Sequence, residues 1–304
     1  MLNKLPINIK FFPFPHFFDI HEEYSKVGNQ KKETCGSFTL AYMLRGLGFE
    51  RTGYNEVYED YVASIARVNI MLEEAEKWKD AMEKIRNGEL TKERARQKYG
   101  DILYDFELPV AKEPKEAGGS AEGVRVACER ITDGKIMAIP IPAREEDKIY
   151  FTQNIFSKLV KLIRDFSDEW NIEMIANYNT GHLLDVEDES YNLINIILHW
   201  NDTSFFPTSK WIVGHFVNIA GFVEFKVVNK KSVYVLIRDT YKHFGFGGYH
   251  LQPLENFRRA LVRNDGREGG LLITAPTENR KKIEGAITNL GLSLGVWDNG
   301  SPFR

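Results

Sequence analysis

Three residue types that can carry out thiol chemistry follow one another along this chain. Cys35 stands in the segment Gln30-Lys-Lys-Glu-Thr-Cys35-Gly36, directly before a stretch with helical character. A thiol at the start of a helix faces unpaired backbone N–H groups and the positive end of the helix dipole, and both favour the thiolate that attacks carbonyl carbons. Downstream, His215 opens a β-like segment and Asp239 ends the next one. The order is that of a nucleophile, a base and an orienting carboxylate.

Other residues offer weaker alternatives for the same chemistry. His182 is a rival base because Asp185 is close in sequence, but it lacks the flanking pair of β-like segments, so we rank it second. His199, beside Trp200, is expected to be a strand residue or part of a cleft wall. Cys128 lies in an amphipathic segment and is expected to be a small buried residue. A lone cysteine or histidine is more often structural than catalytic, so a purely structural set remains the alternative.

The first histidines could be taken for a metal site. His16 and His21 lie near Asp19 and Glu22, but no further ligands follow at suitable spacing, so a surface loop is the better interpretation. We therefore expect no metal and no organic cofactor. Both cysteines are expected to be free thiols, because two cysteines exclude a disulfide framework and a nucleophile must stay reduced.

The elements that must position these residues point to the α+β class. Alternating β-branched runs predict strands over residues 215–226 and 231–238, and a final strand over 269–276. A helix is predicted over residues 35–47, and its small and apolar side chains all round suit a buried central helix. Helices at the front and an antiparallel sheet at the back would bring Cys35 and His215 together across one cleft.

The middle of the chain reads mainly as helix. Apolar residues recur at three- and four-residue steps over residues 55–86, and Thr91 opens a second helix, so 55–105 is predicted to be a helical hairpin. The apolar side chains form a stripe along one face of this hairpin. The stripe could pack on the core beside the cleft, so that the hairpin acts as a cap, which we favour, or it could form a dimer interface. Residues 151–170 predict another helix, and residues 192–200 predict a buried strand.

Composition excludes several classes of protein. The 304 residues are 43% hydrophobic and 27% charged with a net charge of −3, which is typical of a soluble globular chain without a nucleic-acid footprint. The apolar start of the chain is broken by prolines and lacks a signal-peptide cleavage site, and no segment reaches the apolar length of a membrane span. We therefore expect a cytoplasmic protein with no membrane or nucleic-acid partner.

The motifs together resemble a known superfamily. The resemblance rests on three motifs in order: Gln and Cys-Gly at the head of a helix, Gly214-His-Phe-Val-Asn-Ile-Ala-Gly221, and a strand that ends in Ile-Arg-Asp-Thr-Tyr241. With these motifs the chain resembles the papain-like cysteine peptidases, and within them it is closest to bacterial C39-like domains. The segment Gly247-Gly-Tyr-His-Leu-Gln-Pro-Leu-Glu-Asn-Phe257 is similar to the way those domains close their sheet. The resemblance covers residues 28–50 and about 190–276.

The resemblance implies a fold and its boundaries. It implies one papain-like α+β domain over residues 1–304, with a central N-terminal helix packed on an antiparallel β-sheet. Its core would comprise residues 1–54 and 190–276. Residues 55–189 would be a large helical insertion, and residues 277–304 a C-terminal helix.

The resemblance also assigns roles to individual residues. Cys35 would be the nucleophile, His215 the base that later protonates the leaving amine, and Asp239 the acceptor that sets the imidazole tautomer. Gln30 would donate to the oxyanion together with the Cys35 backbone N–H. Gln30 lies five residues before the cysteine where the family has six, so Asn29 is the alternative donor. Thr240 stands where the family often has proline.

These roles imply a cysteine peptidase, a hydrolase that cleaves an amide bond of a peptide or protein through an acyl-enzyme. Two alternatives stay open: an acyltransferase or deamidase with the same triad, and a catalytically idle papain-like binding module. The segment 55–105 also leaves a homo-oligomer open.

Overall fold

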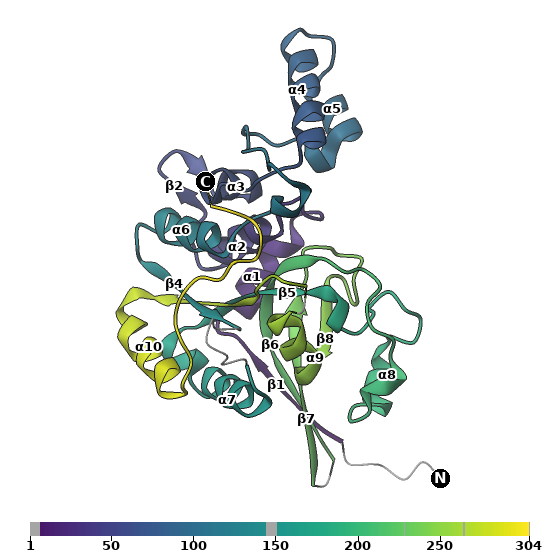
Figure 1. Ribbon diagram of the computed structural model, residues 1–304, viewed down its shortest axis with the longest axis vertical. Helices are drawn as coiled ribbons and strands as arrows, with labels where there is room; N and C mark the ends of the chain where they lie inside the picture. The colour runs from purple at the N-terminus through teal and green to yellow at the C-terminus, as the bar shows by residue number, and fades with distance from the viewer. Residues whose placement is uncertain (1–6, 144–150, 228, 264, 304) are drawn as a thin grey trace.

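The computed structural model describes residues 7–143, 151–227, 229–263 and 265–303. Within these ranges, seven strands form one antiparallel sheet, which confirms the α+β class. The strand order is β4-β9-β5-β6-β7-β8, and β1 pairs with the far half of β6 (Figure 1). The strands are β1 (Ile7–Pro13), β4 (Ile136–Pro142), β5 (Glu173–Asn179), β6 (Gly214–Val227), β7 (Lys230–Arg238), β8 (Tyr249–Pro253) and β9 (Gly270–Pro276). A separate small hairpin pairs β2 (Arg51–Thr52) with β3 (Asn55–Glu56).

Helices cover both faces of the sheet (Figure 1). One face carries α1 (Phe17–Ser25), α2 (Cys35–Gly46), α3 (Glu59–Ala66) and α6 (Ala121–Ile131), and the other carries α7 (Gln153–Trp170), α9 (Leu254–Val262) and α10 (Arg280–Asn289). Beyond these lie α4 (Leu72–Arg86), α5 (Lys92–Tyr99) and α8 (Leu193–Leu198). Successive strand residues point to opposite faces of the sheet, so each strand contributes side chains to the hydrophobic cores on both faces. In β5, Ile175 joins the core under α2, whereas Met174 joins the core under α7.

Strand β6 organises the sheet because it changes neighbour along its length. Its first half pairs with β5 as far as Ile219, and its second half pairs with β1 from Gly221 onward. The register against β7 shifts between these two residues. Gly221 has φ +147°, and a Cβ there would lie 2.4 Å from the Phe12 carbonyl oxygen, so only glycine fits. His215 lies at the start of the half that pairs with β5.

Residues 55–189 are not a helical insertion throughout, contrary to our prediction. Strands β4 and β5 come from this range, and β5 lies between β6 and β9 inside the sheet. The prediction failed because β5 is short and its seven residues are all buried, so it shows no alternation by which to recognise it. Residues 190–276 therefore do not complete the sheet without this range.

The predicted single helix over residues 55–86 is two helices. Helix α3 ends at Ala66, because the next residue, Arg67, has a left-handed backbone, and Asn69 then forms a bridge with Gly118. The regular spacing of apolar residues continues across this break because Val68 and Ile70 are also buried, although these two residues do not lie on a helix. The predicted second helix is confirmed: Thr91 caps α5, and its hydroxyl accepts a hydrogen bond from the Arg94 N–H.

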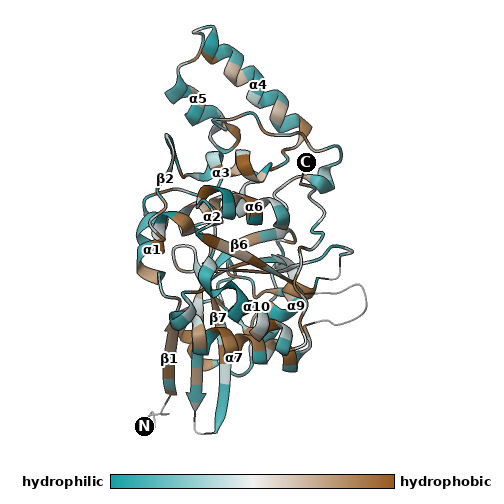
Figure 2. Ribbon diagram, turned by 90° about the vertical axis from the view of Figure 1, so that its left-hand side faces the viewer, coloured by the Kyte–Doolittle hydropathy of each residue, from teal (hydrophilic) through white to brown (hydrophobic). Residues whose placement is uncertain are grey.

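Helices α4 and α5 form a projecting hairpin at one end of the molecule, at the top of Figure 1. Figure 2 shows that most residues of this hairpin are hydrophilic. The apolar stripe of α4 packs against α5: Ala81, Met82 and Ile85 share a small cluster with Ala95 and Leu90. This part of the stripe is thus partly buried within the hairpin, whereas Val57, Val68 and Ala75 of the same stripe pack in the core around α2.

Two further predictions need correction. Residues 192–200 are not a strand, since α8 occupies Leu193–Leu198 and Asn192 caps it by accepting from the Asn195 N–H. The C-terminal helix covers only Arg280–Asn289, within the predicted 277–304, and the chain beyond is not helical as far as it is described. The non-helical part is held by Trp297, whose indole N–H donates to Asn177 Oδ1 over 3.0 Å.

Candidate active site

Cys35 is the first residue of α2 and is partly exposed. The first N–H groups of a helix have no partner within it, so the Cys35 N–H is available outside the helix. The Thr34 carbonyl starts the helix by accepting from the Phe38 N–H over 2.8 Å. The thiol is therefore held at a fixed place where the helix meets a cleft.

The loop before Cys35 is held by the start of α3. The Glu59 carboxylate accepts hydrogen bonds from the Thr34 hydroxyl and from the Lys31 N–H. The Lys31 ammonium in turn bonds Asp60 Oδ2 and the Leu103 carbonyl. These contacts fix the backbone that presents the thiol, so α3 belongs to the support of the site.

Gly36 allows α2 to approach β6 closely. A Cβ at this position would lie 2.9 Å from Val124 Cγ2 and 3.4 Å from the Phe216 ring. Real side chains essentially never approach to 2.9 Å, so a larger residue would push the helix away. Because Phe216 follows His215, this contact sets the separation of the two candidate catalytic residues.

His215 and Asp239 form a buried hydrogen-bonded pair. His215 Nε2 lies 3.1 Å from Asp239 Oδ1, and both residues are 2% exposed. Asp239 Oδ1 also accepts from the Tyr241 N–H over 3.0 Å. The other imidazole nitrogen, Nδ1, is not used by Asp239, and Cys35 lines the same cleft as this ring.

The charges of this pair stabilise each other. Burial lowers the pKa of His215, but the Asp239 charge and the hydrogen bonds to Asp239 and Cys35 outweigh it and raise this pKa to about 10. Burial raises the pKa of Asp239, but His215 and a hydrogen bond from His250 bring it well below its usual value. A charged imidazole beside a carboxylate is thus the favoured state of the folded chain.

Aromatic rings enclose the imidazole. Trp211 meets the His215 ring edge-on at a centroid distance of 5.1 Å, and Tyr241 lies nearly parallel to it at 6.0 Å. Tyr178 closes a third side at 6.3 Å. These rings restrict the motion of the imidazole and its access to water.

The structure distinguishes between the two candidate oxyanion donors. Gln30 is buried in the cleft, and its Oε1 accepts from the Thr240 hydroxyl over 2.5 Å. The Gln30 amide N–H group is therefore the part left to face a ligand. Asn29 is exposed, and its Oδ1 accepts from the Lys242 N–H over 2.8 Å. Gln30 lies with Cys35 and Asn29 does not.

Cys35, His215 and Gln30 line one cleft of about 370 Å³, a size typical of ligand sites. Helix α4 forms part of its wall through Glu73, Glu74 and Lys77, together with Met71 just before it. The base of the projecting hairpin thus borders the site.

Glu33 is a carboxyl group in this cleft with an unusual setting. Its backbone is left-handed, with φ +61°. Burial, and then the charge of Glu74, raise its pKa to about 7. The other cleft carboxylates face cations: Glu73 lies 2.5 Å from Lys77, and Glu74 lies 3.8 Å from Lys32.

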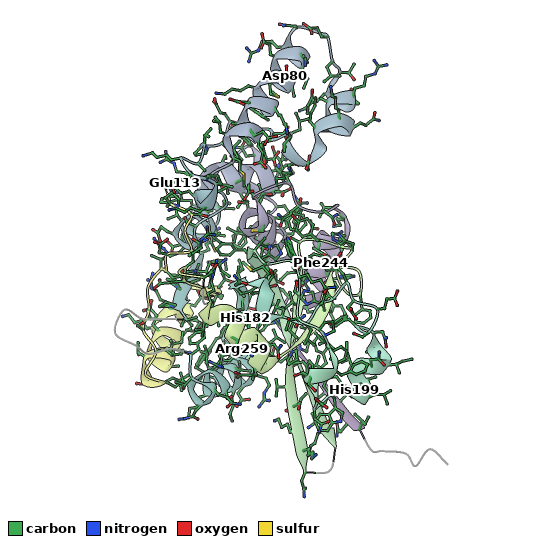
Figure 3. All side chains as sticks on the ribbon, turned by 45° about the vertical axis from the view of Figure 1, so that its right-hand side comes forward. Asp80, Glu113, His182, His199, Phe244 and Arg259 are labelled. Carbon is green, nitrogen blue, oxygen red and sulfur yellow. The ribbon has the colours of Figure 1, made fainter. Side chains whose placement is uncertain are left out.

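The weaker candidates lie elsewhere. His182 packs over α9, where its carbonyl accepts from Asn256, and it does not line the cleft (Figure 3). His199 stacks on Phe205 beside α8. Both cysteines are free, and Cys128 is fully buried, which raises the pKa of its thiol.

The first histidines do not lie in a surface loop as predicted, since His16 directly precedes α1 and His21 lies within it. His16 lies 3.4 Å from Asp19, and His21 bonds the Tyr249 hydroxyl. Among the residues that the structure describes, no three His, Cys, Asp or Glu side chains gather as a metal site would require.

Sequence reasoning missed His250, Thr240 and Trp211 as parts of the site. His250 lies in the segment that resembles the family's sheet closure, and the resemblance assigns it no role. A signal existed: Asp239 pairs with Gly248 across the β7–β8 connection, and a residue two positions further on β8 is a diagonal neighbour on the same face. Thr240 and Trp211 carry no comparable signal, because their places depend on loops.

Comparison with known proteins assigns the chain to a protein family, but it identifies no activity. No curated protein matches the chain. Over the described ranges, no helix combines the length and apolar content needed to cross a bilayer. A family match spans residues 14–298 and so includes Gln30, Cys35, His215 and Asp239. The chain therefore belongs to the protein family described as "Family of unknown function (DUF6885)".

Proposed function

We propose that this chain is a papain-like cysteine peptidase that cleaves an amide bond through Cys35, His215 and Asp239. The observation that carries the proposal is the convergence on one cleft of a partly exposed thiol, a side-chain amide and a buried imidazole that is hydrogen-bonded to a carboxylate behind it. They come from α2, β6, the end of β7 and the loop before α2, as in the papain-like arrangement that the motifs resemble.

In this mechanism the Cys35 thiolate attacks the amide carbonyl carbon while His215 is protonated. The Gln30 amide N–H and the Cys35 backbone N–H stabilise the oxyanion that forms. His215 gives its proton to the leaving nitrogen, the C–N bond breaks, and a thioester remains on Cys35. Water then attacks the thioester, with neutral His215 taking a proton from it, and the acid and the thiol are released.

The electrostatics of the site support this assignment. A neutral histidine next to a neutral thiol would be a poor nucleophilic pair. Here the Asp239 charge favours the protonated His215, which is the partner that a reactive thiolate needs. The cleft wall carries side chains of both signs, and it has room for an extended peptide segment.

The first test is the rate at which Cys35 reacts with iodoacetamide at about pH 6, where ordinary thiols react slowly. We expect the wild-type chain to be alkylated at Cys35 much faster than glutathione, with His215→Ala removing the difference. His199→Gln is the control, because His199 lies outside the cleft. Alkylation of the wild type at the rate of glutathione would argue for the idle binding module.

The second test identifies the reaction. The chain is incubated with a mixed peptide library, with and without an added primary amine, and products are read by mass spectrometry. New peptide ends indicate hydrolysis, amine adducts indicate acyl transfer, and a mass gain of one unit at glutamine indicates deamidation. Each product must disappear with Cys35→Ala. Fast alkylation without any product would overturn the peptidase assignment.

A further inference from the structure

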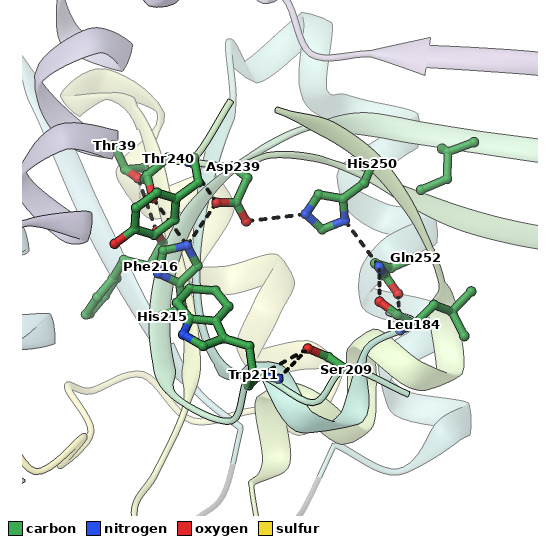
Figure 4. A network of polar contacts seen from close by, with 12 residues as sticks. Thr39, Leu184, Ser209, Trp211, His215, Phe216, Asp239, Thr240, His250 and Gln252 are labelled. Atoms are coloured by element: carbon green, nitrogen blue, oxygen red, sulfur yellow. Dashed lines mark hydrogen bonds and ion pairs between the residues drawn. The ribbon is translucent and has the colours of Figure 1, made fainter. Parts of the chain in front are cut away.

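A second histidine contacts Asp239 on the side away from His215. His250 Nε2 lies 3.3 Å from Asp239 Oδ2, while His215 Nε2 lies 3.1 Å from Asp239 Oδ1. Both imidazoles and the carboxylate are 2% exposed. Figure 4 shows the carboxylate held between the two rings.

The backbone of Leu184 determines the orientation of the next residue in this chain of contacts. Gln252 Oε1 accepts from the Leu184 N–H over 2.8 Å, and Gln252 Nε2 donates to the Leu184 carbonyl over 3.2 Å (Figure 4). If the oxygen and nitrogen of the Gln252 amide were exchanged, its NH2 group would face the Leu184 N–H and its oxygen would face the Leu184 carbonyl oxygen, so neither hydrogen bond could form. The Gln252 amide is fully buried, so it has no solvent to compensate such a reversal.

The orientation of Gln252 in turn determines the tautomer of His250. The second N–H of the Gln252 amide points at His250 Nδ1, 3.2 Å away, so Nδ1 must be an acceptor without a proton. The proton of the neutral ring is then on Nε2, which faces Asp239 Oδ2. The backbone of Leu184 thus makes His250 a donor to Asp239 without giving it a charge.

We propose that His250 is a positioning residue for the reaction, which holds Asp239 as a negatively charged acceptor aligned with His215. The inference rests on the proposed function and deepens it. A neutral donor on Oδ2 satisfies the buried carboxylate without neutralising its charge, so the full charge stays available to the imidazolium of His215. Loss of this donor frees the carboxylate to turn and weakens its hold on His215.

The cavity beside His250 holds two carboxylic residues besides Asp239. Tyr178, Asp185 and Glu187 line the small cavity beside His250. Glu187 lies 3.9 Å from His243 on the outer side. Leu184 belongs to the segment that leads to Trp211, because it bridges to Thr208. The same segment therefore supports His215 through Trp211 and Asp239 through His250.

The test compares His250→Leu, which removes the donor, with His250→Gln, which keeps an N–H donor. The readout is the pH profile of Cys35 alkylation by iodoacetamide. At about pH 6 we expect His250→Leu to be alkylated at least about tenfold more slowly than wild type, and His250→Gln to stay within about threefold. His199→Gln is the matched control. A folded His250→Leu variant with the wild-type profile would overturn the inference.

A second measurement covers the case in which His250→Leu fails to fold. Ring ¹⁵N resonances of the wild-type chain report which nitrogen of His250 carries the proton, and the geometry requires Nε2. Gln252→Glu replaces the donor to Nδ1 by an acceptor of the same shape, so a proton should appear on Nδ1 in this variant. Gln97→Glu, on the exposed side of α5, is the control. A proton on Nδ1 in the wild type would overturn the inference.

These outcomes separate the inference from the proposed function. Slow alkylation of wild-type Cys35 would remove the proposed reaction, and with it the role of His250 in that reaction. Fast alkylation of the wild type with an unchanged profile in His250→Leu would remove only the role of His250.

Discussion

The Gln30 side chain and the Thr240 hydroxyl share a hydrogen bond of 2.5 Å, although 210 residues separate them in the chain. The same hydroxyl lies 3.3 Å from His215 Nε2. One hydroxyl group thus connects the proposed oxyanion donor with the proposed base, and it joins the loop before α2 to the end of β7.

This link predicts the effect of removing the Thr240 hydroxyl. Thr240→Val should lower kcat roughly tenfold, because Gln30 loses the contact that sets its amide orientation, while Thr240→Ser should retain most of it. Gln30→Ala should cost about 10²–10³-fold in kcat, as loss of an oxyanion donor does. Both are measured by turnover of a peptide that the wild type cleaves. Equal kcat for the Val and Ser variants would contradict the link.

The two cysteines should behave very differently. Cys35→Ser should reduce turnover on the order of 10⁴-fold or more, because the hydroxyl is a far weaker nucleophile than the thiolate. Cys128→Ser should keep the reaction, since Cys128 lies on the buried face of α6, but it should lower the melting temperature because a hydroxyl replaces a buried thiol. Full turnover in Cys35→Ser would exclude the thiol mechanism.

The His215–Asp239 pair should make stability depend on pH. The folded-state pKa of His215 is about 10 against an ordinary 6.5, so its stabilisation is complete below about pH 6.5 and is lost as pH rises toward 10. The pKa of Asp239 is below its ordinary 3.8, so its contribution is present above that value and is lost as pH falls further. We expect the stability advantage of wild type over His215→Gln to be largest between these limits.

Urea denaturation of wild type and His215→Gln at a series of pH values measures this advantage. His199→Gln is carried through the same series to subtract the effect of losing any histidine. An advantage that grows from about pH 6.5 to 9 would contradict the ion pair.

The negative charge that Glu33 carries at alkaline pH should lower the free energy of unfolding. Burial and Glu74 raise its folded-state pKa from 4.5 to about 7, so the protonated form is favoured by folding. This contribution is present below the ordinary pKa and is lost as pH rises through about 7. Glu33→Gln keeps the neutral form, so it should be more stable than wild type above pH 7 and similar to it at pH 4. Exposed Glu56→Gln is the control, and an equal effect of both substitutions on the urea midpoint would refute the expectation.

The outer part of the hairpin should be dispensable for folding. Residues 79–98 pack mainly among themselves, whereas Trp78 anchors the base through its indole N–H to the Tyr104 carbonyl. Replacing 79–98 by a short Gly-Ser linker should leave cooperative melting and Cys35 alkylation unchanged within about twofold, while cleavage of folded proteins relative to short peptides should rise. An unchanged ratio would remove the idea that the hairpin restricts access.

The sequence alone indicated the candidate chemistry and several of the regular elements around it. The order of Cys35, His215 and Asp239 was readable because each stands at the end of a segment with clear local character. The β-branched alternation of β6 and β7 and the cap at Thr91 are likewise local, because they depend on residues within a few positions of each other. Local sequence patterns of this kind indicate which residues are buried and which residues cap a helix.

Tertiary structure decided which partner each residue meets. The choice of Gln30 over Asn29 depends on contacts to Thr240 and Lys242 from a distant loop. The place of β5 inside the sheet arises from pairing across long separations, and the contact of His250 with Asp239 depends on the register in which β8 pairs with β7. Periodicity along the chain shows that a residue is buried but not what covers it, so these relationships appear only when the folded strands and loops are brought together.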